Sequence, residues 1–104
     1  MLARDLRKVA MASIHATLAR RSRLPPPCVH PSNDELVRLG LRYSAGLDGE
    51  GVDFVLAHTL FNLAALHGSV EAMIYRKELG AEMDPSDVAE AQSAARAWLA
   101  EAAR

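Results

Sequence analysis

Three carboxylates in one glycine-rich loop are the first residues of this chain whose types and spacing could perform chemistry. Asp48, Glu50 and Asp53 lie close together, and carboxylate oxygens are the ligands that Ca²⁺ prefers in proteins. Their spacing is not that of a calcium loop, which alternates its ligands and ends on a glutamate at its twelfth position. Asp53 also stands directly before an apolar segment, where an aspartate caps the start of a helix. The pattern therefore favours a structural loop over a metal site.

A second candidate is the pair formed by Cys28 and His30. Two ligands are too few for a structural zinc site, and the other histidines stand at unrelated positions. Cys28 is the single cysteine, so no internal disulfide forms, and no base that would activate it is evident beside it. We find no nucleophile–base pair, metal cage or cofactor-binding loop in the sequence. We therefore expect a protein that is not an enzyme and that uses no metal or cofactor.

Two polar pairs at helical spacing are the candidate partner-binding residues. His58 and Asn62 are four positions apart, as are Arg38 and Arg42, and residues at this spacing share one face of a helix. The first pair could contact a partner on a binding face, or it could pack against a neighbouring helix with its hydrogen bonds satisfied. The two arginines could receive a carboxylate of a partner, although a solvated helix face is the simpler interpretation.

Positive charge is concentrated in the first 30 residues. These residues include six basic side chains and one acidic side chain, a net charge of +5, whereas the rest of the chain has six basic and twelve acidic side chains, a net charge of −6. Such an arm could bind nucleic acid or an anionic membrane surface, but six basic residues are few for an electrostatic binding surface. A solvated amphipathic helix, or an arm that docks on its own acidic body, is the favoured interpretation. The basic residues of the arm are Arg4, Arg7, Lys8, Arg20, Arg21 and Arg23.

The composition of the 104-residue chain is that of one small helical domain. Half of the residues are hydrophobic, which excludes wholesale disorder, and only 5% are aromatic, which favours helices over a sheet. No stretch reaches the roughly 20 apolar residues of a membrane span. The arginine-rich start is a poor signal-peptide core, although it has some features of an organelle-targeting segment. A cytoplasmic location is the default expectation.

The hydrophobic pattern predicts five helices and no strand. The first is an amphipathic helix over residues 2–22, and the proline-rich segment 24–31 that follows cannot continue it. We therefore divide the chain into an N-terminal helix with its linker, residues 1–31, and a helical domain, residues 32–104.

Four of the predicted helices belong to the helical domain. One ends in the glycine-rich loop, and the others cover about 54–67, 69–82 and 86–102. The residues expected to cap their N-termini are Ser32, Asp53, Ser69 and Asp84. The residues expected on one side of helix 69–82 are Val70, Met73, Ile74 and Ala81. Short loops between consecutive helices predict two antiparallel pairs.

The helix over 54–67 is apolar nearly all round. Its polar residues form only a narrow stripe, so the helix must be covered on more than one side. Helix 2–22 could supply that cover from the same chain or from a second chain, because the stiff proline linker suits an exchange between copies. A foreign partner is the third possible source of this cover. Of these alternatives, the exchange between copies leads us to predict a homodimer.

The stretch LGLRYSAGLDGEGVDFVLAHTLFNLAALHG, residues 39–68, combines small and large residues in a recognisable order. Its small residues are Gly40, Ala57 and Ala64, and its large aromatic residues are Tyr43, Phe54 and Phe61. Small residues at helical spacing let two helix axes approach closely, and the large ones fill the remaining volume. This order resembles the Sel-one-like repeat, a relative of the tetratricopeptide repeat, and residues 71–92 resemble the degenerate helix pair that often ends bacterial arrays.

The resemblance covers about residues 33–96 and departs from the usual repeat in two places. The loop between the paired helices is one residue longer, and Leu60 stands where a tryptophan is common. The resemblance implies an all-α fold, a short α-solenoid of about two antiparallel helix pairs, to which the N-terminal amphipathic helix is added. It also implies a non-enzymatic adaptor that binds another protein in a helical-repeat groove. The alternative function is nucleic-acid or anionic-surface binding by the basic arm.

Overall fold

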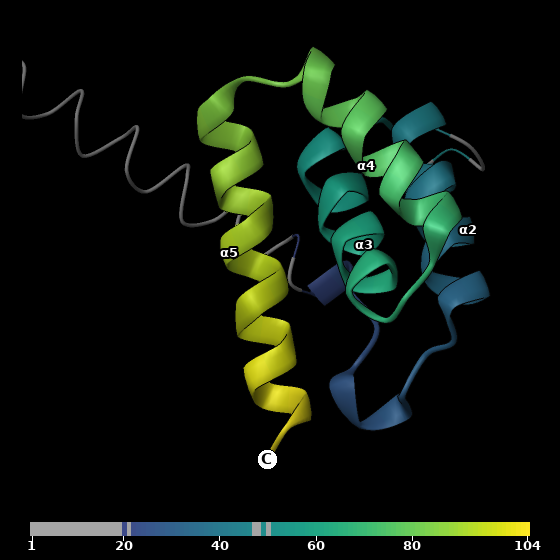
Figure 1. The fold of residues 1–104 in the computed structure, drawn as a ribbon, viewed down its shortest axis with the longest axis vertical. Helices are drawn as coiled ribbons and strands as arrows, with labels where there is room; N and C mark the ends of the chain where they lie inside the picture. Colours follow the sequence, from purple (N-terminus) through teal and green to yellow (C-terminus); the bar gives the residue numbers. More distant parts are fainter. Residues whose placement is uncertain (1–19, 21, 47–48, 50) are drawn as a thin grey trace, which may run out of the picture.

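The computed structural model describes residues 20, 22–46, 49 and 51–104, and this part of the chain is all-α (Figure 1). It contains one short 3₁₀ helix and four α-helices, and no strand lies among the described residues. Their bounds are η1 Pro27–Val29, α2 Asn33–Ala45, α3 Phe54–Leu66, α4 Val70–Glu82 and α5 Pro85–Ala102. The prediction of an all-α fold is confirmed. The predicted helix over residues 2–22 lies outside the described residues, apart from Arg20, Ser22 and Arg23, which are helical.

The N-termini of the helices lie at the predicted capping residues. The side chains of Ser32, Asp53 and Ser69 each accept a hydrogen bond from the backbone N–H three residues later. Such a bond satisfies one of the backbone donors that the first turn of a helix leaves unpaired. Asp84 also occupies an N-cap position, but its side chain makes no capping bond, and Pro85 at the first position of α5 fixes the backbone instead.

Glycines with positive φ angles follow the ends of α2 and α3. Gly46 has a φ of 68° and donates its N–H to the carbonyl of Arg42. Gly68 has a φ of 96°, and the next residue, Ser69, donates its N–H back to the carbonyl of Ala64 at 3.0 Å. Glycine adopts this left-handed conformation without strain, so both helices end where the sequence supplies it.

The central element of the fold is α3. All of its residues from Val55 to Ala65 are buried. It packs against α2, α4 and α5, while α4 and α5 make only sparse contact with each other (Figure 1). The cover that the sequence requires for this helix therefore comes from the three described helices of the same chain. Since these helices cover α3, the need to cover it is no longer a reason to expect a homodimer.

α2 and α3 approach each other closely at Gly40. A Cβ atom on Gly40 would lie 2.5 Å from Cε1 of Phe61, a distance that real Cβ contacts do not show. The Phe61 ring is buried, and its other neighbour is Tyr75 of α4, with 5.3 Å between the ring centroids. Gly40 therefore gives α2 room to pack on the aromatic ring that joins three helices.

Few residues of α4 are buried against the core. Its buried residues are Ala72 and Leu79. The four residues predicted to share one side of this helix are exposed: Val70, Met73, Ile74 and Ala81. The predicted stripe therefore faces away from the core.

No α-helix among the described ranges is both long enough and apolar enough to span a membrane. α5, the longest of them, has 18 residues, but charged side chains interrupt its apolar sequence. Its buried residues are Ala91, Ala95 and Trp98.

Candidate functional site

Arg20 and residues 22–27, called the strap below, lie across α3 and α5 and are attached at two points. At the first point Arg20 Nε lies 3.1 Å from both carboxylate oxygens of Asp53, and its Nη1 lies 3.2 Å from Oε1 of Glu90. Arg23 Nη2 donates to Oδ2 of the same Asp53 at 2.7 Å. The strap is thereby tied to the start of α3 and to α5.

The second attachment point is a hydrogen bond from Trp98 to the proline segment. The indole Nε1–H donates to the carbonyl of Pro25 at 2.7 Å, and the neighbouring Leu24 packs against the hydrophobic core. An extended proline segment makes no internal hydrogen bonds, so its carbonyls are available to an outside donor. Trp98 supplies such a donor while its ring system stays buried.

Asp53 has two functions at once. Its Oδ1 accepts the backbone N–H of Leu56 and so caps α3, as the sequence predicts. The same carboxylate binds the guanidinium groups of Arg20 and Arg23. A negative charge at a helix N-terminus is favourable by itself, and the two arginines add charge-assisted hydrogen bonds. The position of the strap is therefore coupled to the first turn of α3.

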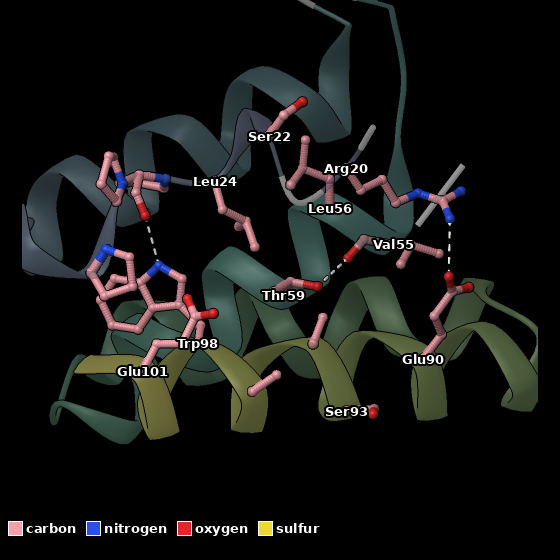
Figure 2. A pocket seen from close by; sticks show the side chains of 15 residues that line it. Arg20, Ser22, Leu24, Val55, Leu56, Thr59, Glu90, Ser93, Trp98 and Glu101 are labelled. Atoms are coloured by element: carbon pink, nitrogen blue, oxygen red, sulfur yellow. Dashed lines mark hydrogen bonds and ion pairs between the residues drawn. The ribbon is translucent and has the colours of Figure 1, made fainter. Parts of the chain in front are cut away.

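A groove of about 490 Å³ lies between the strap and α5 (Figure 2). The residues of α5 that line it are Glu90, Ser93, Ala94, Ala97, Trp98 and Glu101. They follow one side of the helix, because successive members are alternately three residues and one residue apart. The small side chains in the middle of this series leave the space that the larger ones at its ends enclose. The volume is within the range of about 300–1,000 Å³ that is typical of ligand sites.

The interior of the groove is mainly apolar and its ends are polar. α3 contributes Val55, Leu56 and Thr59, and the Thr59 hydroxyl already donates to the carbonyl of Val55 at 2.7 Å. In Figure 2 the Arg20–Glu90 ion pair closes one end, and Trp98 and Glu101 lie toward the other. The groove can therefore bury apolar groups in its middle and form hydrogen bonds at its ends.

His58 and Asn62 lie elsewhere, inside the contact between α3 and α4. They are only 3% and 5% exposed. Asn62 Nδ2 lies 3.1 Å from Nδ1 of His58, and Arg76 of α4 donates to Oδ1 of Asn62 at 3.3 Å. Burial, and secondarily the positive charge of Arg76, lower the pKa of His58 below its ordinary value of 6.5. Of the two alternatives that the sequence leaves open, the structure shows the packed and hydrogen-bonded one.

The arginines predicted to bind partners do not form one site. Arg38 is exposed on α2 and Arg42 is partly buried there, and neither lines the groove. Arg20 and Arg23 of the basic arm form ion pairs with the acidic body, as one interpretation of the arm expects. The other four residues of the arm lie outside the described residues: Arg4, Arg7, Lys8 and Arg21.

The remaining candidates do not form a cluster. Cys28 is exposed on η1, and His30 follows it in the left-handed backbone conformation with a φ of 51°. Within the described ranges no three His, Cys, Asp or Glu side chains are placed to hold a metal ion. Asp48 and Glu50 of the carboxylate loop lie outside those ranges.

Comparisons with protein-family models, with curated proteins and with solved structures found no match to this chain. The resemblance to the Sel-one-like repeat therefore depends on its residues alone. The groove was not predicted from the sequence, because it depends on the position of the strap. One available signal was the run of small residues, Ser93, Ala94 and Ala97, on the same side of a helix as Trp98.

Proposed function

We propose that this chain is a non-enzymatic adaptor that binds an apolar segment of a partner protein in the groove between the strap and α5. The observation that carries the proposal is the groove itself. It has an apolar interior and polar ends, and it is enclosed by a strap that ion pairs and a hydrogen bond hold in place. A site formed in advance in this way requires little ordering when a partner binds.

The shape of the groove favours a peptide segment over a compact small molecule. Its lining follows α5 from Glu90 to Glu101. At 1.5 Å per residue this part of the helix is about 16 Å long, which an extended peptide of about five residues spans. At the Glu90 end the Arg20 guanidinium balances the carboxylate. The expected partner segment is therefore apolar in its centre and polar at its ends.

The residue types in the groove support binding over catalysis. None of the described residues that line it is a histidine, cysteine or lysine. Histidine is the most frequent general base of enzymes, and cysteine and lysine are among their activated nucleophiles. The hydroxyl of Thr59 is already bonded within α3.

The alternative function, binding of nucleic acid by the basic arm, has less support. Arg20 and Arg23 are engaged with Asp53, and Arg20 is also engaged with Glu90. A phosphate would have to displace these carboxylates before it could use either guanidinium. Salt distinguishes the two functions, because phosphate binding weakens steeply with ionic strength and apolar binding in the groove does not.

Site-specific crosslinking followed by titration tests the adaptor function. A photoreactive p-benzoylphenylalanine is placed at Ser93 in the groove and, as the control, at the exposed Arg38 on α2. We expect defined partner proteins to be crosslinked from Ser93 and not from Arg38. A peptide from the crosslinked region is then titrated into the purified full chain by calorimetry.

Two alanine positions on α5 provide a matched pair of variants. Ala97 lines the groove, whereas Ala100 is exposed on the same helix and does not line it. Ala97→Trp should fill the groove and weaken peptide binding at least tenfold, and Ala100→Trp should leave it unchanged. Equal affinities of the two variants, or the same crosslinks from Ser93 and Arg38, would contradict the proposed function.

A further inference from the structure

The contact between α3 and α4 contains a chain of hydrogen-bonding side chains whose direction depends on one proton. Nδ2 of Asn62 lies 3.1 Å from Nδ1 of His58, and Oδ1 of the same amide accepts from Nη1 of Arg76 at 3.3 Å. An amide nitrogen only donates, so Nδ1 of His58 is the acceptor and is unprotonated. Among the described residues, the bond to Arg76 is the one side-chain hydrogen bond between these two helices. The polar link between α3 and α4 therefore passes through the Asn62 amide.

Few other contacts hold α4 in place. Its buried residues are Ala72 and Leu79, and it makes only sparse contact with α2 and α5. The His58 and Asn62 side chains are buried, so water does not simply replace a partner that either of them loses. A change in the direction of the chain therefore acts directly on how α4 is held.

Protonation of His58 reverses the direction of the chain. Both ring nitrogens of a charged histidine are donors, so Nδ1 then points an N–H at the amide nitrogen of Asn62, which also donates. A half turn of the amide removes this conflict, because it presents Oδ1 to the new N–H. The same turn places Nδ2 opposite the guanidinium of Arg76, where one donor faces another.

We propose that His58 is a pH switch in the contact between α3 and α4, whose protonation turns the Asn62 amide over and releases Arg76 from α3. The bond between His58 and Asn62 is kept with its direction reversed, and the bond to Arg76 is broken. The guanidinium is only partly buried, so it can turn to solvent. α4 then stays on α3 through its apolar residues, Ala72 and Leu79.

The surroundings of the ring make this an acidic switch. α3 has no other titratable side chain, and from α4 the ring is faced by Arg76 and by Gly80, on which a Cβ atom would lie 3.3 Å from Nε2. No described residue of α2 or α5 contributes a charge that shifts the pKa of His58. Burial, and then the charge of Arg76, lower this pKa below 6.5. The neutral ring therefore prevails near neutral pH, and the switch operates below pH 6.5.

Nuclear magnetic resonance of the isotope-labelled full chain, between about pH 7.5 and about pH 5, tests the switch. The resonances of the Asn62 side-chain amide and of Arg76 Nε should shift together with those of the His58 ring, with one midpoint below pH 6.5. Gln92 and Arg38 carry the same two kinds of group at exposed positions on α5 and α2. Their resonances are the matched controls and should not follow this midpoint.

Two charge-removing variants on α4 test which groups act on the ring. Arg76→Gln removes the positive charge that faces His58, so the midpoint should shift to higher pH. Lys77→Gln is the matched control, because it removes the neighbouring exposed charge of the same helix and should leave the midpoint unchanged.

Asn62→Asp tests the turning amide. A carboxylate accepts from both neighbours without turning, so Arg76 should stay bound and its resonance should no longer follow the His58 ring. The midpoint of His58 should rise by about one pH unit or more, because an opposite charge beside the ring favours its charged form. Circular dichroism checks that each variant is folded.

The proposal makes no use of the adaptor function, because His58, Asn62 and Arg76 do not line the groove between the strap and α5. An Arg76 resonance that stays constant while His58 titrates in the wild type would overturn the switch. Equal midpoints in Asn62→Asp and the wild type would exclude the amide as the coupling group. If the resonances of α2 change in the same step, the proton is taken up by unfolding of the whole molecule, and the switch is wrong.

Discussion

His58 shows how one buried residue makes stability depend on pH. Its neutral ring accepts a hydrogen bond from Nδ2 of Asn62, and the positive charge of Arg76 lies close by. Its pKa is lowered in the folded protein relative to its ordinary value of 6.5. The unfolded chain consequently takes up the proton first as the pH falls. The stabilising contribution of neutral His58 is complete above pH 6.5 and is lost as the pH falls below this value.

We therefore predict that the free energy of unfolding decreases from pH 7.5 to pH 5.5, by at most about 1.4 kcal/mol per pH unit for this one group. Urea denaturation at a series of pH values measures it. His58→Gln cannot titrate and should remove this part of the pH dependence, whereas replacement of the exposed His67 should not. An unchanged slope in His58→Gln would assign the effect to other groups.

Gly40 allows a second prediction, about packing. Gly40→Ala adds a Cβ atom 2.5 Å from the Phe61 ring, so α2 and α3 must separate or the ring must move. Overpacking of this kind costs about 1–3 kcal/mol, and the better helix propensity of alanine offsets about 1 kcal/mol. We expect a net destabilisation of up to about 2 kcal/mol in denaturant titrations.

The background variant Phe61→Leu provides the control for this prediction. The smaller side chain makes room for the new Cβ atom, so Gly40→Ala should cost less in this background than in the wild type. The difference between the two costs is the coupling energy of a double-mutant cycle. If the stability costs of Gly40→Ala and Phe61→Leu are additive, the Cβ atom at position 40 does not interact with the Phe61 ring.

Among the elements, the strap is joined to the start of α3 through one carboxylate, that of Asp53. Asp53→Asn separates the two functions of this side chain, because asparagine also caps helices but does not carry the charge that binds Arg20 and Arg23. We predict a loss of about 1 kcal/mol of stability, the scale of partly exposed charged hydrogen bonds. Trp98, the single tryptophan of the chain, should also emit at longer wavelength, because the loosened strap exposes its indole.

Asp84→Asn is the matched control for the strap. Asp84 occupies the same N-cap position of α5, but its side chain makes no capping bond and forms no ion pair with a described residue. The control should change neither the stability nor the tryptophan emission. If both variants behave alike, the Asp53 ion pairs do not hold the strap.

The helices themselves were predictable from short stretches of sequence. Ser32, Asp53 and Ser69 cap helices through hydrogen bonds to residues only three positions away. Capping of this kind is local, so the sequence contains the information without a tertiary structure. The direction in which α4 faces is different. Its apolar stripe was predicted, but whether the stripe faces inward depends on which neighbours α3 already has.

At the scale of the whole molecule, the candidate groove depends on contacts between distant parts of the chain. The Arg20–Asp53 pair joins residues 33 positions apart, and the Trp98–Pro25 hydrogen bond joins residues 73 positions apart. Neither hydrophobic periodicity nor a short motif indicates contacts between residues that are so far apart in the sequence. The sequence therefore predicted that α3 needs cover on several sides, but it did not predict that α5 and the strap would leave a groove beside it.

The central position of α3 also has a consequence for how the molecule unfolds. In a long repeat array each unit contacts only its neighbours, and the ends can melt while the middle stays folded. Here α2, α4 and α5 are all joined through α3, whose side chains form the shared core. Loss of any outer helix exposes that core, so the described helices should lose their structure in one cooperative step. The amide protons of α3 would then exchange with solvent only when the whole molecule opens.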